Sequence, residues 1–123
     1  SPEEIAASFI NSFRKNIKIY PDFYHFYFEM WSASRRNKKI KKVFRTALDN
    51  TINATKVVLI NAQEKGLLSI GLENIESIAI SLVSKADGLG LILEQYPQLI
   101  ENENLWKSDK KMWMSVLENQ IED

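Results

Sequence analysis

Residues 72–95 read LENIESIAISLVSKADGLGLILEQ, and this stretch decides the fold class. Its apolar residues recur every three or four positions, which is the spacing of an α-helix. One apolar stripe consists of Ile75, Ile78, Ala79, Leu82, Ala86, Leu89 and Leu93, and a second stripe on another side consists of Ile80, Val83, Leu91 and Ile92. A helix that is apolar on two sides needs two partners. The chain's own core supplies one, and we expect a second subunit to supply the other.

Two glycines, Gly88 and Gly90, lie inside this predicted helix. Each costs about 1 kcal/mol relative to alanine in a helix interior. We expect the close approach of a neighbouring helix to offset that cost. The pair Tyr96-Pro97 ends the helix, because the residue before a proline avoids the helical region.

Four further helical stretches are predicted, at residues 1–20, 21–34, 38–65 and about 104–121, because few windows show the alternation of a strand. Ser1-Pro2-Glu3-Glu4 forms a capping box for the first. Gly66 ends the third in the left-handed conformation, and Ser108 or Asn104 caps the last. The last helix carries the apolar residues Met112, Trp113, Val116, Leu117 and Ile121. The prediction is an all-α bundle of about five helices, one domain over residues 1–123.

Composition excludes several classes of function. Apolar residues make up 45% and charged residues 26%, which is typical of a soluble globular domain. The absence of cysteine and the single histidine, His25, exclude thiol catalysis, Cys-ligated metals and multi-His metal sites. No phosphate-cradling glycine loop, membrane-length apolar run or export leader is present. We therefore expect a cytoplasmic binding or assembly module, with no enzyme activity, cofactor or membrane partner.

Charge differs between the two halves of the chain, although the net charge is zero. Residues 1–62 carry 11 Lys and Arg against 5 Asp and Glu, and residues 63–123 carry 5 against 11. Opposed charges favour docking of the two parts, within one chain or between subunits.

Aromatic residues concentrate in the second stretch, where seven of the chain's 13 lie between Tyr20 and Trp31. One face carries Tyr24, Tyr27, Phe28 and Trp31, and it is broadened by Phe23, Phe26 and Met30. His25 falls on the narrower polar side. A helix this apolar is expected to be buried on most sides. The last stretch carries Trp106 and Trp113, which are costly to leave in water, so we expect it to dock on another element, for which a matching helix of a partner would be suitable.

The aromatic face has two interpretations, a packed core or the wall of a pocket for an apolar ligand. The candidate ligand-binding residues are Phe9, Phe13, Tyr24, Tyr27, Phe28, Trp31, Phe44, Leu48, Thr51, Thr55 and Leu82. Thr51, Asn53 and Thr55 either orient the ligand or face solvent. The seven basic residues between Arg35 and Arg45 either contact phosphates or form the solvated face of a helix, and the interleaved apolar residues favour the latter.

Three segments carry a family resemblance. They are FYFEMWSASRRN at residues 26–37, QEKG at residues 63–66 followed by the restart Leu72-Glu73, and ADGLGL at residues 86–91. In their order and spacing, over the whole chain, they resemble the C-terminal domain of the tetracycline-repressor (TetR/AcrR) family of bacterial transcription regulators.

The resemblance implies a ligand-sensing and homodimerisation domain of a repressor. A small apolar or aromatic effector would shift the first helix and control DNA binding by an N-terminal helix-turn-helix domain, which this chain lacks. DNA would be contacted through that missing domain alone. The homodimer would be built on the last two helices, and its expected interface residues are Ile78, Leu82, Leu89, Leu93, Trp113, Val116 and Leu117.

Two other classes of function remain open. One is a helical adaptor that binds another protein through a surface containing Trp106 and Trp113 and senses no ligand. The other is a small helical enzyme with an apolar cavity, which the lack of converging acid, base or metal-binding residues disfavours.

Overall fold

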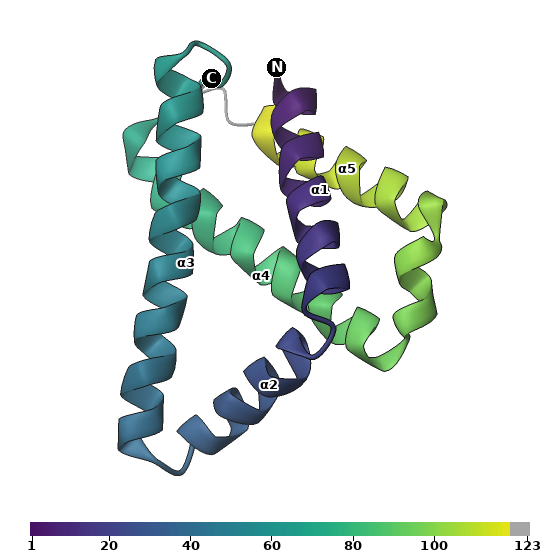
Figure 1. Cartoon of the computed structure of the whole chain (residues 1–123). Helices are drawn as coiled ribbons and strands as arrows, with labels where there is room; N and C mark the ends of the chain where they lie inside the picture. Colours follow the sequence, from purple (N-terminus) through teal and green to yellow (C-terminus); the bar gives the residue numbers. More distant parts are fainter. Residues whose placement is uncertain (119–123) are drawn as a thin grey trace.

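Five α-helices follow one another along the chain (Figure 1). They are α1 (Pro2–Ile19), α2 (Phe23–Ser34), α3 (Lys38–Glu64), α4 (Ile75–Gln95) and α5 (Glu103–Glu118), with short 3₁₀ helices η1 (Leu72–Asn74) and η2 (Pro97–Glu101) on either side of α4. The computed structural model describes residues 1–118, without the side chain of Leu72, and no strand occurs there. The predicted all-α bundle of five helices is confirmed. Ile121, predicted on the apolar stripe of the last helix, lies outside the described residues.

The predicted helix ends at Ser1, Gly66 and Tyr96-Pro97 are confirmed, the last because α4 ends at Gln95, and the predicted start of the last helix is wrong. The side chain of Ser1 accepts a hydrogen bond from the backbone N–H of Glu4 at 3.4 Å. Gly66 adopts a φ of +75° after α3, which is the left-handed region. The last helix, however, begins before Asn104, because the side chain of Asn102 accepts a hydrogen bond from Leu105 N–H at 3.2 Å and caps it.

The helices pack in two groups that share one core (Figure 1). The long α3 lies along one edge and packs on α4, α1 packs on α5, and α2 contacts both α3 and α4. The core side chains are Ile5, Ala6, Ile10, Leu59, Ala62, Leu68, Ile70, Ile75, Ile78, Ala79, Leu82, Leu93, Trp106, Trp113 and Leu117. Among residues 1–118, no helix has both the length and the apolar character needed to cross a membrane.

Both tryptophans of α5 are buried within the chain. The Trp113 ring stacks on Phe9 of α1 with 4.8 Å between centroids. The indole of Trp106 donates a hydrogen bond to the carbonyl of Ile100 at 2.7 Å. The predicted docking of this helix is confirmed, but it docks on α1 of the same chain, so the expected helix of a partner is wrong. The surface through which an adaptor would bind is therefore inside the molecule.

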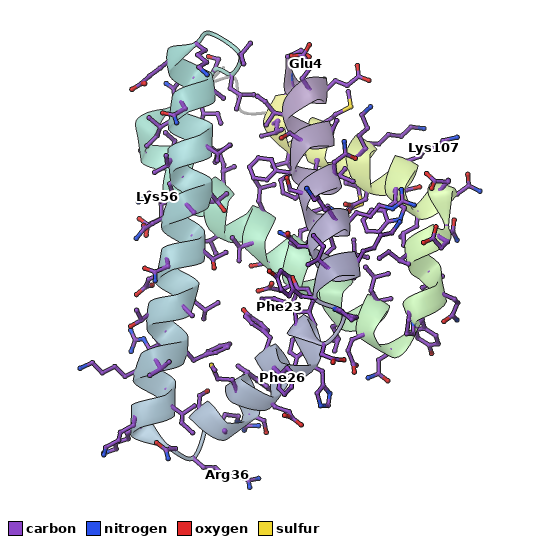
Figure 2. The ribbon with its side chains drawn as sticks, in the orientation of Figure 1. Glu4, Phe23, Phe26, Arg36, Lys56 and Lys107 are labelled. Atoms are coloured by element: carbon purple, nitrogen blue, oxygen red, sulfur yellow. The ribbon has the colours of Figure 1, made fainter. Side chains whose placement is uncertain are left out.

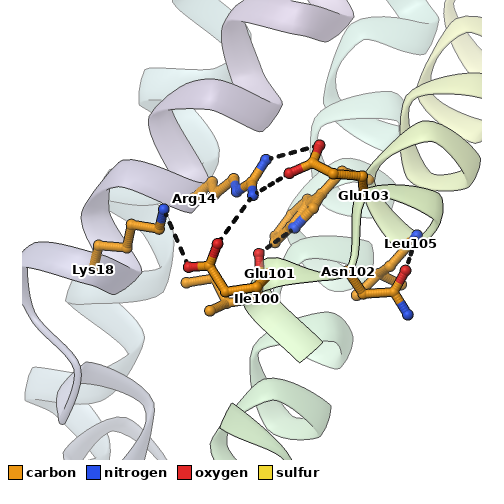
Figure 3. Close-up of polar contacts among 8 residues, drawn as sticks. Arg14, Lys18, Ile100, Glu101, Asn102, Glu103 and Leu105 are labelled. Carbon is orange, nitrogen blue, oxygen red and sulfur yellow. Dashed lines mark hydrogen bonds and ion pairs between the residues drawn. The ribbon is translucent and has the colours of Figure 1, made fainter. Parts of the chain in front are cut away.

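Opposite charges join the two ends of the chain (Figure 3). Arg14 of α1 lies 2.6 Å from Glu103, and Lys18 lies 3.4 Å from Glu101. These carboxylates are largely exposed, so the pairs orient the start of α5 more than they stabilise the fold. Deeper in the molecule, Lys85 of α4 forms an ion pair with the buried Asp109 of α5.

Gly90 lets α2 approach α4 closely. A Cβ atom at this position would lie 2.6 Å from Cδ2 of Tyr24 and closer still to two other carbons of that ring. A Cβ atom at Gly88 would meet nothing within 4 Å. The predicted close approach of a neighbouring helix therefore explains Gly90 and leaves Gly88 unexplained by contacts within the chain.

The two glycines should respond oppositely to alanine. We expect Gly90→Ala to lower the free energy of unfolding by about 1–3 kcal/mol, because the buried Tyr24 ring must move. Gly88→Ala should raise it by up to about 1 kcal/mol through helix propensity. Urea unfolding followed by circular dichroism, at low protein concentration so that association contributes nothing, measures both. If the two substitutions changed the free energy of unfolding equally, the close contact would not be specific to Gly90.

Candidate functional site

The aromatic helix α2 is only partly covered, so the prediction that it is buried on most sides is wrong. Tyr24 and Ser34 are its buried residues, whereas Phe23, Phe26, Met30 and Trp31 are between 40% and 63% exposed. The reason is geometric: α3 and α4 cover α2 from one direction, and the described chain supplies no helix for the other.

An apolar groove lies between α2 and α3. Its volume is about 630 Å³, within the range of ligand pockets, which are mostly apolar. The lining residues of this aromatic groove are Ile19, Tyr20, Pro21, Asp22, Phe23, Phe26, Tyr27, Met30, Phe44, Ala47 and Thr51. Figure 2 labels Phe23 and Phe26 on α2, and Arg36 at the tip where α2 turns into α3.

One wall residue of the groove also connects α2 to α4. The hydroxyl of Tyr27 donates a hydrogen bond to Asp87 Oδ2 at 2.7 Å, and the hydroxyl of Tyr24 donates one to Asp87 Oδ1 at 3.0 Å. Burial and the nearby Asp87 carboxylate raise the pKa of both tyrosines above the usual value. Both therefore remain protonated donors at neutral pH. The ring of Tyr27 also packs against Phe44 of α3, with centroids 5.1 Å apart.

The groove brings together three of the predicted ligand-binding residues, which are Tyr27, Phe44 and Thr51. Phe13 and Tyr24 line a neighbouring hollow of about 450 Å³ between α1 and α2. A third hollow, of about 500 Å³, lies on the other side of the α1–α2 turn and includes His25 and Glu94. His25 is exposed, as predicted, and its Nε2 atom lies 3.2 Å from Glu29.

The other predicted ligand-binding residues do not line the groove. Phe9 stacks on Trp113, and Leu82 is 1% exposed in the core. Trp31 is exposed beside the guanidinium of Arg35, which lies 5.6 Å from its ring. The remaining three, Phe28, Leu48 and Thr55, are half-buried elsewhere.

The predicted orienting hydroxyls already have acceptors. Thr51 donates to the carbonyl of Ala47, and Thr55 donates to the carbonyl of Thr51, both at 3.0 Å. Asn53 is exposed. The hydroxyl protons of Thr51 and Thr55 are therefore already used, and these side chains would serve a ligand as acceptors rather than as donors.

Sequence reasoning assigned no ligand contact to several lining residues, namely Ile19, Tyr20, Phe23, Phe26, Met30 and Ala47. On α2 the signal was present but ambiguous. The stripe at Tyr24, Phe28 and Trp31 and the stripe at Phe23, Phe26 and Met30 are both helical in spacing, and only the packing of α2 against α4 decides which one stays open. Asp87 gave no sequence signal of a contact with tyrosines of another helix.

Most of the residues predicted for the dimer interface are buried within the single chain. Ile78, Leu82, Leu93, Trp113 and Leu117 are between 1% and 6% exposed, and they form core contacts. Leu89 and Val116 are half-buried against the same core. A second copy would have to contact other residues. The exposed side of α4 offers Ile80, Ser81, Ser84, Gly88, Leu91 and Ile92, which carry no charge.

The seven basic residues between Arg35 and Arg45 are all exposed. The structure of residues 1–118 places none of them in an ion pair. Within the same part of the chain, no three His, Asp or Glu residues gather where they could hold a metal ion.

Comparisons with models of known protein families, with curated proteins and with solved structures find no match to this chain.

The contact between the tyrosines and Asp87 should make stability fall at alkaline pH. The folded-state pKa of both tyrosines lies above the unfolded value of about 10, so their contribution is complete below pH 10 and is lost as the pH rises through and beyond it. Tyr27→Phe should lower the free energy of unfolding by about 1–2 kcal/mol near neutral pH and reduce the alkaline loss. Chemical unfolding at several pH values measures both effects. The exposed Tyr96→Phe is the control, and an identical pH dependence in the two variants would contradict the role of Tyr27.

Proposed function

We propose that this chain is the ligand-sensing and homodimerisation domain of a transcriptional regulator resembling the TetR/AcrR family, and that the aromatic groove binds a small apolar or aromatic effector. The observation that carries the proposal is the double role of Tyr27. Its ring lines the groove and its hydroxyl holds Asp87 of α4. A molecule in the groove therefore acts directly on the contact between α2 and α4.

The end of α1 supports the same proposal. Ile19 and Tyr20 line the groove together with residues of α2 and α3. An effector that favours one position of Ile19 and Tyr20 would shift the equilibrium between two arrangements of α1, which is the requirement for allosteric control. In this proposal, the helix-turn-helix domain that contacts DNA would be joined before α1.

The exposed side of α4 supports the homodimer. Ile80, Leu91 and Ile92 are between 44% and 49% exposed. The Ser84 hydroxyl donates to the carbonyl of Ile80 at 2.7 Å, so it does not require water. Gly88, which meets nothing in its own chain, would allow a helix of a second copy to approach closely. The proposal thus moves the interface from the buried stripe of α4 to the exposed members of its second stripe, because Val83 of that stripe is buried.

Filling the groove should abolish effector binding. We expect the neutral fluorophore N-phenyl-1-naphthylamine to bind the wild-type chain with an increase in fluorescence. Ala47→Trp should weaken binding at least tenfold, because the indole occupies the groove that Ala47 lines. Ala54→Trp, at an exposed alanine of the same helix outside the groove, is the matched control. Equal binding by both variants would refute the groove as the site.

A charge on the exposed side of α4 should separate the two copies. We expect the wild-type chain to sediment as a dimer at micromolar concentration and Leu91→Glu to sediment as a monomer, because a carboxylate buried in an apolar interface is costly. Val57→Glu, on the exposed side of α3, should remain a dimer. A wild-type monomer under these conditions would overturn the homodimer.

A further inference from the structure

The aromatic groove continues toward the tip between α2 and α3. A second hollow, of about 460 Å³, is lined by Phe26, Glu29, Met30, Ala33, Lys39, Ile40 and Val43. Phe26 and Met30 line both hollows, so the two adjoin along α2 and α3, and we call them together the valley. Along α2 the valley runs from Phe23 to Ala33, which is about 15 Å at the rise of an α-helix. This shape suits an elongated molecule.

The middle of the valley favours an apolar body. Its side walls are mostly aromatic or aliphatic, and the hydroxyls of Tyr27 and Thr51 already donate to Asp87 and to the Ala47 carbonyl. A polar group placed there would lose its water without gaining a hydrogen bond from these donors. A hydrogen-bond acceptor on the ligand, such as a carboxylate, is therefore favoured at an end of the valley.

The two ends of the valley differ in charge. At the α1–α2 turn the lining includes the carboxylate of Asp22. At the other end it includes Lys39, within the basic cluster of Arg35, Arg36, Lys38, Lys39, Lys41, Lys42 and Arg45. Glu29 also lines this end, so one carboxylate lies there against the seven cations of the cluster.

Four lysines of the cluster lie at the start of α3, where the helix dipole is positive and acidic residues are favoured. The first turn of α3 contains no acidic residue. In the described chain no carboxylate forms an ion pair with these cations, as noted above. The lysines at this end repel one another, and an anion bound here would reduce that repulsion.

We propose that the valley binds an amphiphilic anion, an unbranched aliphatic chain that ends in one carboxylate. The chain lies along Phe23, Phe26 and Met30, and the carboxylate meets Lys39 and its basic neighbours. Asp22 disfavours the reverse orientation. This inference rests on the proposed ligand-sensing function and narrows the effector from an apolar molecule to an amphiphilic one.

Isothermal titration calorimetry with octanoate, decanoate and dodecanoate, below their micelle concentrations, tests the proposal. Affinity should rise about fourfold per added methylene, as expected for burial of the chain. It should also fall with salt, because the carboxylate contact is exposed to solvent. Decanol and decyltrimethylammonium should bind more weakly than decanoate.

Two substitutions that change the charge by the same amount test where the carboxylate of the ligand binds. Lys39→Glu should weaken decanoate binding about three- to tenfold and leave the binding of N-phenyl-1-naphthylamine unchanged. Lys111→Glu, on the exposed side of α5, should change neither. Equal weakening of decanoate binding by both substitutions would overturn the inference.

The remaining outcomes separate this inference from the proposed function. Decanol binding as tightly as decanoate would overturn the amphiphilic anion and leave an apolar effector in place. Loss of all binding, including that of the neutral fluorophore, would remove both proposals. Binding to anionic phosphatidylglycerol vesicles that Lys39→Glu weakens and Ala47→Trp does not, without measurable decanoate binding, would assign the cations to a lipid surface and overturn the inference.

Discussion

The ring of Tyr24 lies against Gly90, and the hydroxyls of Tyr24 and Tyr27 both end on Asp87. This contact sets the distance and the rotation of α2 relative to α4. Because α2 is held by its Tyr24 side, the opposite stripe at Phe23, Phe26 and Met30 remains uncovered. The aromatic groove exists because α2 is held in this orientation. The continuation of the groove toward the basic tip follows from the same orientation.

The chain divides its interactions between a well-packed end and a sparsely packed end. Phe9, Trp106 and Trp113 fasten α5 to α1, and Lys85 pairs with Asp109 across α4 and α5. At the α2–α3 end, aromatic side chains are exposed and the basic residues have no carboxylate partners. Ligand sites and moving elements tend to come from regions with few buried contacts. The proposed sensing function places the effector at that end, and the well-packed end would act as the scaffold.

Helix α4 carries the exposed stripe, whereas the aromatic groove lies between α2 and α3. Asp87 connects α4 to the groove through Tyr27, and Gly88, the next residue, lies on the exposed side. In the proposed function, α4 therefore responds to a ligand in the groove and also forms the contact between the two copies. A rotation of α4 by a few degrees would change the packing both at the groove and at the exposed stripe, because a packed interior transmits small shifts.

The sequence by itself determined the helices, several of their ends and the presence of two apolar stripes on α4, because these depend on local spacing, caps and proline or glycine positions. The capping role of Ser1 and the left-handed Gly66 are local in this sense. The tertiary structure alone decided which stripe of α2 stays open, why Gly90 but not Gly88 is crowded, and that Trp113 and Leu117 face the chain's own core rather than a second copy. Both stripes of a doubly apolar helix look alike along the chain. Only the positions of helices far away in sequence decide which one is covered.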